Sequence, residues 1–209
     1  MVRLRRCCLN PDRKTVLGGV RRRQVLLGSV ALLATGGCTP AQESVFDESK
    51  LRDLVEHVLR NRLGFAVGKQ GMTPPVVVSF DPTCPHCHNL WRSLVPLWGE
   101  FGFVWVPVAA RHESLQRGAA LLTSPSPKDL MASFVDSATS KELALPAGGG
   151  DFDAAAKSIE DFTARVFQIG VTALPFVVSQ SKTGRFRGRI GSMSASEYRA
   201  WQNDAEIAA

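Results

Sequence analysis

The stretch of sequence that decides the fold lies at residues 76–91 and reads VVVSFDPTCPHCHNLW. Its first five residues are mostly β-branched and apolar, which is typical of a short strand buried on both faces. Proline is favoured at the first position of a helix, so Pro85 makes Cys84 the N-cap and Cys87 the third helical residue. The sequence therefore predicts a pair of cysteines at the start of a helix, directly after a buried strand.

This placement predicts a reactive thiol at Cys84. The free N–H groups of the first helical turn, the positive end of the helix dipole and a protonated His86 all favour its thiolate. The dipole contributes only about 0.3–1 kcal/mol, so hydrogen bonds must supply most of any large decrease in the pKa of Cys84. A stabilised thiolate also stabilises the reduced pair and makes its disulfide a stronger oxidant. We expect Cys87 to be the less exposed partner.

The segments closest to this stretch predict further elements of an α/β domain. Apolar residues at helical spacing predict an amphipathic helix at residues 51–63. The helix that follows the cysteines carries apolar residues at the same spacing from Leu90 to Phe101. Residues 103–108 read as a second strand, in which Pro107 indicates either a sheet edge or the end of the strand.

The second half of the chain completes the α/β order. Residues 113–150 read as an insertion that is helical in part. A further helix, closed by Gly170, carries an apolar stripe formed by Ile159, Phe162, Val166 and Phe167. Residues 175–190 read as an antiparallel hairpin, and Ser194 with Glu197 forms a capping box for a last helix. This order of strands and helices predicts an α/β fold.

Two motifs resemble the thioredoxin superfamily, and most closely the catalytic domain of its bacterial periplasmic disulfide isomerases, DsbC and DsbG. The first motif is residues 80–91, FDPTCPHCHNLW, and the second is residues 170–178, GVTALPFVV, which resembles the family's cis-proline loop. The resemblance covers residues 73–205. It implies a thioredoxin fold with a helical insertion, preceded by an N-terminal linker helix within residues 39–72.

The resemblance also implies roles for individual residues. Cys84 is the attacking thiol, Cys87 the resolving thiol, Pro175 the cis-proline beside them, and Leu174 a residue that lines the substrate groove. The Pro-His dipeptide, which includes His86, is that of the strongly oxidising DsbA branch, and family isomerases commonly have Thr where Leu174 stands. Both features favour dithiol oxidation over isomerisation.

The resemblance further implies the partners of the protein. The substrates are exported proteins with cysteines, no bound cofactor is needed, and an unidentified redox partner recycles the pair. Family isomerases carry a separate N-terminal dimerisation domain, whereas residues 39–72 leave room for little more than a linker helix. We therefore expect a monomer or a weak dimer.

The charge of the chain is concentrated at its N-terminus. The 209 residues include 25 lysines and arginines and 19 aspartates and glutamates, a net charge of +6. Residues 1–38 hold eight of the basic residues and one acid, which leaves 17 basic and 18 acidic residues from position 39 onward. A nucleic-acid partner is excluded because it requires a clustered basic surface.

Residues 1–38 read as an export signal. The basic run precedes an apolar stretch at residues 25–37 that is too short to span a membrane as a helix. Arg22 and Arg23 match a twin-arginine signal, and they match equally the positive region of an ordinary signal. Cys38 follows Thr-Gly-Gly and resembles the acylated cysteine of bacterial lipoproteins, although Thr35 stands where Leu is usual. We therefore expect a periplasmic or other extracytoplasmic location. Cys38 is then either acylated as a lipid anchor or lies next to a site of simple signal cleavage.

Three alternatives compete with a redox pair. Residues 84–88, CPHCH, also match the c-type haem attachment pattern, for which Met131, Met193 or His112 would be the second axial ligand. A zinc site is disfavoured because no H-x₃₋₅-H pair follows the cysteines. In a lipoprotein binding module the cysteines would form a purely structural disulfide, which is disfavoured because so short a loop strains the bond. We expect no metal and no haem.

Overall fold

The computed structural model describes residues 46–69, 71, 74–136 and 149–203. The expected leader at residues 1–38, with the lipidation candidate Cys38, lies outside the described residues, and so do residues 137–148 of the expected insertion. Among the helices that are described, none is long and apolar enough to cross a membrane.

In the described part of the chain, five strands form one sheet in the order β1-β3-β2-β4-β5. The strands are β1 (Phe65–Gly68), β2 (Val76–Phe80), β3 (Gly102–Pro107), β4 (Phe176–Gln180) and β5 (Phe186–Ile190). β2 and β3 are parallel, and the other three pairs are antiparallel, which confirms the predicted hairpin of β4 and β5. Because β3 lies inside the sheet, Pro107 marks the end of its strand and not an edge.

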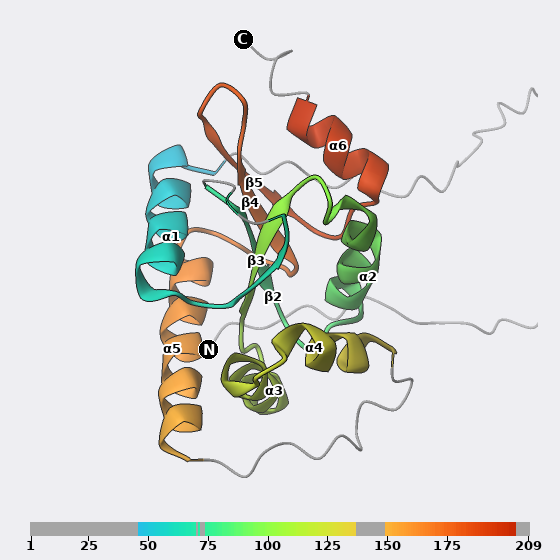
Figure 1. Cartoon of the computed structure of the whole chain (residues 1–209). Helices are drawn as coiled ribbons and strands as arrows, with labels where there is room; N and C mark the ends of the chain where they lie inside the picture. The colour runs from blue at the N-terminus through green and yellow to red at the C-terminus, as the bar shows by residue number, and fades with distance from the viewer. Residues whose placement is uncertain (1–45, 70, 72–73, 137–148, 204–209) are drawn as a thin grey trace, which may run out of the picture. The chain divides into compact units, whose positions relative to one another are not determined.

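Helices cover both faces of this sheet, with α1 and α5 on one side and α2 and α6 on the other (Figure 1). Their bounds are α1 (Glu48–Asn61), α2 (Pro85–Leu94), α3 (His112–Thr123), α4 (Pro127–Asp136), α5 (Gly150–Gln168) and α6 (Ala195–Asn203). The helices α3 and α4 confirm that residues 113–150 are helical in part. At the start of α6, the predicted capping box is present: the Ser194 N–H donates to Glu197 Oε2, and the Glu197 N–H donates to Ser194 Oγ.

The buried residues alternate between the two faces along β2, as the period of two in a strand requires. Val76, Val78 and Phe80 belong to a core cluster on the side of α2 and α6, whereas Val77 belongs to a second cluster on the side of α1 and α5. All five residues of β2 are buried, which confirms the prediction of a strand buried on both faces. We call the cluster that contains Phe80 the α2-side core.

The segment before residue 73 differs from the expected linker. Helix α1 buries one face in the second cluster, including Leu51 and Leu54, so it is part of the core. The unpredicted strand β1 pairs antiparallel with β3, with Phe65 opposite Trp105. The sheet and the core therefore include residues well before position 73.

Two details of the predicted helices also differ from the structure. Helix α2 ends at Leu94 and continues only as a short 3₁₀ turn, η1 (Val95–Leu97), so Phe101 lies outside it. Pro96 explains this end because it has no N–H to continue the helical hydrogen bonds. Phe167, predicted on the apolar stripe of α5, is exposed, while Val166 beside it is buried.

Candidate active site

The two cysteines lie at the N-terminus of α2, where the sequence predicted them. Cys84 is the N-cap, with extended backbone angles of φ −87° and ψ 121°, and Pro85 is the first helical residue. Both cysteines are free thiols. No cap hydrogen bond of ordinary length and angle reaches the side chain of Cys84.

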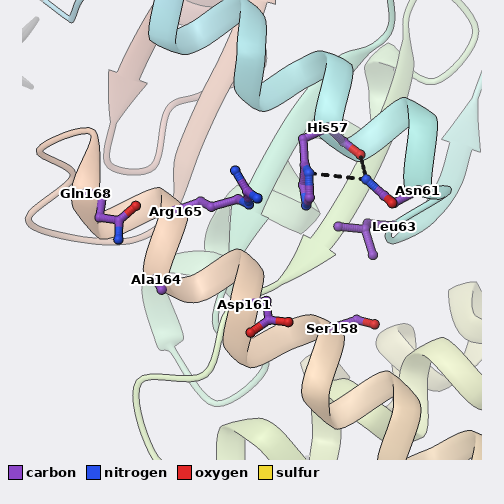
Figure 2. Close-up of a pocket in the computed structure, with 8 residues that line it drawn as sticks. All are labelled: His57, Asn61, Leu63, Ser158, Asp161, Ala164, Arg165 and Gln168. Carbon is purple, nitrogen blue, oxygen red and sulfur yellow. Dashed lines mark hydrogen bonds between the residues drawn. The ribbon is translucent and has the colours of Figure 1, made fainter.

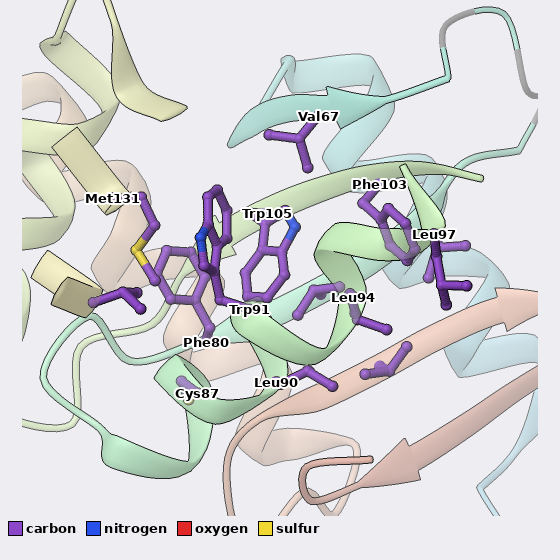
Figure 3. Packing of buried hydrophobic residues seen from close by; sticks show 14 of the residues in the cluster. Val67, Phe80, Cys87, Leu90, Trp91, Leu94, Leu97, Phe103, Trp105 and Met131 are labelled. Carbon is purple, nitrogen blue, oxygen red and sulfur yellow. The ribbon is translucent and has the colours of Figure 1, made fainter. Parts of the chain in front are cut away.

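The two thiols differ sharply in their surroundings. Cys84 is partly exposed, whereas Cys87 has no exposed surface and lies within the α2-side core. Figure 3 shows Cys87 in the first turn of its helix among the packed residues, close to Phe80. The backbone N–H of Asp81 donates to Cys87 Sγ at 3.4 Å. Cys84 is thus the accessible thiol of the pair, as expected.

The same asymmetry appears in the acidity of the thiols. The hydrogen bond from the Cys87 thiol, helped by the backbone N–H groups of Cys87 and His86, lowers the pKa of Cys84 to about 6 although burial opposes this. Burial, followed by the interaction with Cys84, raises the pKa of Cys87 far above its usual value. Near neutral pH, the Cys84 thiolate therefore accepts a hydrogen bond from the protonated Cys87 thiol.

The two histidines of the motif have different environments. The side chain of His86 is exposed, and it is the backbone N–H of His86 that contributes to the lowered pKa of Cys84. His88 is partly buried, and its Nε2 lies 2.8 Å from the carbonyl oxygen of Pro82. Because a carbonyl oxygen can only accept a hydrogen bond, Nε2 of His88 carries the proton and donates it. This hydrogen bond links α2 to the turn that precedes it.

The proline loop lies at the same end of the sheet as the thiols. The Leu174–Pro175 peptide bond is cis, as the resemblance implied. β4 begins at Phe176, which pairs with Ser79 near the end of β2. Continuing this antiparallel register places Pro175 opposite the last residue of β2, and the turn to Cys84 follows that residue. Cys84 and Leu174 both pack against the α2-side core.

Three residues that sequence reasoning did not assign join this site. Asp81 is buried, and its carboxylate accepts hydrogen bonds from Thr83 and Ser114. An aspartate two residues before a threonine is a local signal for the turn at Asp81 and Thr83. For Ser114, which comes from α3, nothing near the cysteines in the sequence indicates a contact.

Solved structures share this arrangement of strands and helices. A periplasmic thioredoxin-like protein from Salmonella enterica serovar Typhimurium matches with a TM-score of 0.55 and 17% identity, over 73% of this chain and 95% of its own. The thiol-disulfide exchange protein alpha-DsbA2 from Wolbachia pipientis matches with a TM-score of 0.53 and 14% identity, over 76% and 95%. The catalytic domain of Proteus mirabilis ScsC also has a TM-score of 0.53, with 12% identity over 75% and 97%.

This chain has a thioredoxin-like fold. No protein-family model and no curated protein sequence matches it. At such low identities, the structural matches establish the fold, and the chemistry has to be argued from this chain's own residues.

The thioredoxin-like fold does not present the CPHCH motif to a haem. Attachment through two thioethers requires both cysteine sulfurs to reach the porphyrin, but Cys87 is completely buried. The Nε2 atom of His88, which would bind the iron, is hydrogen-bonded to Pro82. Of the three candidate axial ligands, Met131 and Met193 are buried in the α2-side core, and His112 is exposed at the start of α3. The residues therefore do not fit a c-type haem.

Within the described ranges, no group of three or more His, Cys, Asp or Glu side chains gathers where it could hold a metal ion. A surface pocket of about 400 Å³ lies between α1 and α5 (Figure 2), on the side of the second cluster. It is lined by His57, Asn61, Leu63, Ser158, Asp161, Ala164, Arg165 and Gln168. None of the site residues expected from the sequence lines this pocket.

Proposed function

We propose that the protein is an extracytoplasmic thiol–disulfide oxidoreductase in which Cys84 and Cys87 form the redox-active pair. It oxidises thiols of other exported proteins, and a separate redox partner restores its disulfide. The leader at residues 1–38 supports the location, and the resemblance of Cys38 to an acylated cysteine supports attachment to a membrane.

The observation that carries this proposal is the difference between the two thiols. A partly exposed Cys84 with a pKa of about 6 is a good leaving group and is accessible to a substrate thiol. The buried Cys87, whose pKa is raised, takes up a proton as soon as its sulfur is released. A structural disulfide has no need of such a difference.

Oxidation then proceeds in two balanced exchanges. A substrate thiolate attacks Cys84 Sγ of the disulfide, which forms the mixed disulfide, breaks the Cys84–Cys87 bond and leaves Cys87 to take up a proton. A second substrate thiolate attacks the substrate sulfur of the mixed disulfide and releases Cys84 as a thiolate. The substrate loses two electrons and the pair gains them. The two substrate protons go to Cys87 and to the solvent.

The proposal is tested with two cysteine variants and a protein substrate in its reduced and its disulfide-bonded forms. Cys84→Ser removes the atom that is attacked, so we expect no exchange with the substrate. Cys87→Ala removes the resolving thiol. With the disulfide-bonded substrate, its Cys84 thiolate attacks a substrate disulfide and releases one substrate thiolate, so mixed disulfides at Cys84 should accumulate and be visible by mass spectrometry. Full activity of the purified Cys84→Ser protein would contradict the assignment.

The direction of the reaction is a separate measurement. Because the Cys84 thiolate is stabilised, the reduced pair is favoured, and the pair should be clearly more oxidising than thioredoxin, whose potential is about −270 mV. We expect faster oxidation of a reduced multi-disulfide substrate than rearrangement of a scrambled one. A potential near that of thioredoxin, or preferential rearrangement of the scrambled substrate, would contradict the oxidising role.

A further inference from the structure

Asp81, the first residue after β2, has a buried side chain and contacts both cysteines through its backbone. Asp81 is 4% exposed. Its backbone N–H donates to Cys87 Sγ, and its carbonyl oxygen accepts from the Cys84 N–H at 3.0 Å. A carboxylate that is removed from water needs hydrogen-bond donors because an unpaired buried charge is strongly unfavourable. The source of these donors therefore matters for the chemistry next to it.

Two parts of the chain donate to this carboxylate. The Thr83 N–H and the Thr83 hydroxyl each donate to Oδ1 at 2.7 Å. The Ser114 hydroxyl donates to Oδ2 at 2.9 Å. Ser114 lies 33 residues further along the chain, in the first turn of α3, and is completely buried. Helix α3 thus reaches back to the redox site through one side chain.

The loss of the Ser114 hydroxyl cannot be compensated within the turn. Thr83 Oγ1 and Ser114 Oγ also lie 3.2 Å apart. Each hydroxyl has a single proton, and both protons are used by the ionised carboxylate. Thr83 cannot donate to Oδ2 without giving up Oδ1, and its N–H is fixed in the backbone. Removing the serine hydroxyl therefore leaves the anion with fewer donors.

The charge of Asp81 acts on both thiols. The carboxylate raises the pKa of Cys84 and that of Cys87, which opposes the groups that stabilise the Cys84 thiolate. A hydroxyl proton on Oδ2 offsets part of this negative charge. Ser114 can thereby influence Cys84 through Asp81.

We propose that Ser114 is a positioning residue of the redox site, which holds the Asp81 carboxylate as a hydrogen-bonded anion and so limits its repulsion of the Cys84 thiolate. This inference rests on the proposed function and deepens it. Helix α3, which lies in the expected insertion, would then influence the equilibrium between the disulfide and the reduced form of the pair.

The test compares Ser114→Ala, Asp81→Asn and the double variant. In Ser114→Ala the carboxylate is less well compensated, so the pKa of Cys84, followed by the ultraviolet absorbance of the thiolate, should rise. The equilibrium constant for reduction of the disulfide by glutathione should fall about threefold, because a hydrogen bond to a charged group is partly lost. In Asp81→Asn the repelling charge is gone, so the pKa should fall and reduction should become more favourable.

The double variant distinguishes positioning from packing. If Ser114 acts through the carboxylate, Ser114→Ala adds no further change to the Asp81→Asn protein, because their effects are coupled. Ser158→Ala removes a serine hydroxyl that bonds within α5 and should leave both measurements at the wild-type values. Ser114→Thr keeps the donor and should restore the glutathione equilibrium.

Three results would overturn the inference. They are an unchanged glutathione equilibrium in folded Ser114→Ala, an equal effect of Ser114→Ala with and without Asp81, and no fall in the pKa of Cys84 in Asp81→Asn. The last result is decisive even where Ser114→Ala does not fold. Failure of the proposed function is seen separately, as a wild-type disulfide that does not exchange with glutathione or with a substrate protein.

Discussion

At the scale of single residues, the chemistry depends on two identical side chains in unlike surroundings. A thiol is alkylated in its thiolate form. The rate of alkylation of Cys84 should therefore rise with pH and reach half its maximum near pH 6, because the pKa of Cys84 is about 6. Cys87 is buried and protonated, so it should not react in the folded protein. Iodoacetamide labelling of the reduced protein across a pH series, read by mass spectrometry, measures both rates. A midpoint near the pKa of an ordinary thiol, about 8.5, would contradict the local stabilisation of Cys84.

Residue-scale predictions succeed where the cause is local in the sequence. Pro85 alone was enough to place Cys84 at the N-cap, because a proline fits the first helical position. Asp81 belongs to the same motif, but its burial could not be predicted because it depends on how α3 packs against the end of β2. Ser114 could not be connected to Asp81 because their contact joins residues 33 positions apart.

At the scale of elements, helix α3 must approach the sheet closely for Ser114 to reach Asp81. Gly118, one turn after Ser114 on the same helix face, permits this approach. A Cβ atom at Gly118 would lie 2.9 Å from Ile159 Cδ1 of α5 and 2.9 Å from Pro107 Cβ at the end of β3. Ile159 can move the end of its side chain, but the proline ring is stiff.

Gly118→Ala should therefore destabilise the protein although alanine is the better helix former. Overpacking in a core costs about 1–3 kcal/mol, and the gain in helix propensity is about 1 kcal/mol, so we expect a net loss of about 1 kcal/mol in the free energy of unfolding. Urea unfolding measures this loss. Gly150→Ala is the control, because a Cβ atom there meets nothing within 4 Å. Equal stability of the two variants would show that α3 is not held against β3 at Gly118.

The elements that were not predicted have weak or misleading patterns. The strand β1 has four residues, of which Phe65 and Val67 are buried, and so short an alternation does not stand out from a loop. Its place in the sheet comes from pairing with β3, more than thirty residues later. In α2 the apolar spacing continues past Pro96, but the backbone cannot continue its hydrogen bonds there.

At the scale of the whole molecule, the sequence indicated a linker helix followed by a separate domain. In the structure this helix, α1, packs into the second cluster, and the strand that follows it, β1, joins the sheet. The sequence of α1 predicted its amphipathic face but could not show what that face covers. In the structure this face covers the second cluster, in which Leu51 lies with Phe162 of α5 and Phe176 of β4.

This shared core predicts how the molecule unfolds. Leu51 is 1% exposed, so Leu51→Ala leaves a cavity and should lower the free energy of unfolding by about 3 kcal/mol. Leu59, on the same helix, is 41% exposed, and Leu59→Ala should change it by less than about 0.5 kcal/mol. Urea unfolding of both variants should give a single transition, because α1 and the sheet bury the same surface. A linker helix that packs on nothing would instead make the two substitutions equivalent, and equal midpoints would show that α1 does not stabilise the fold.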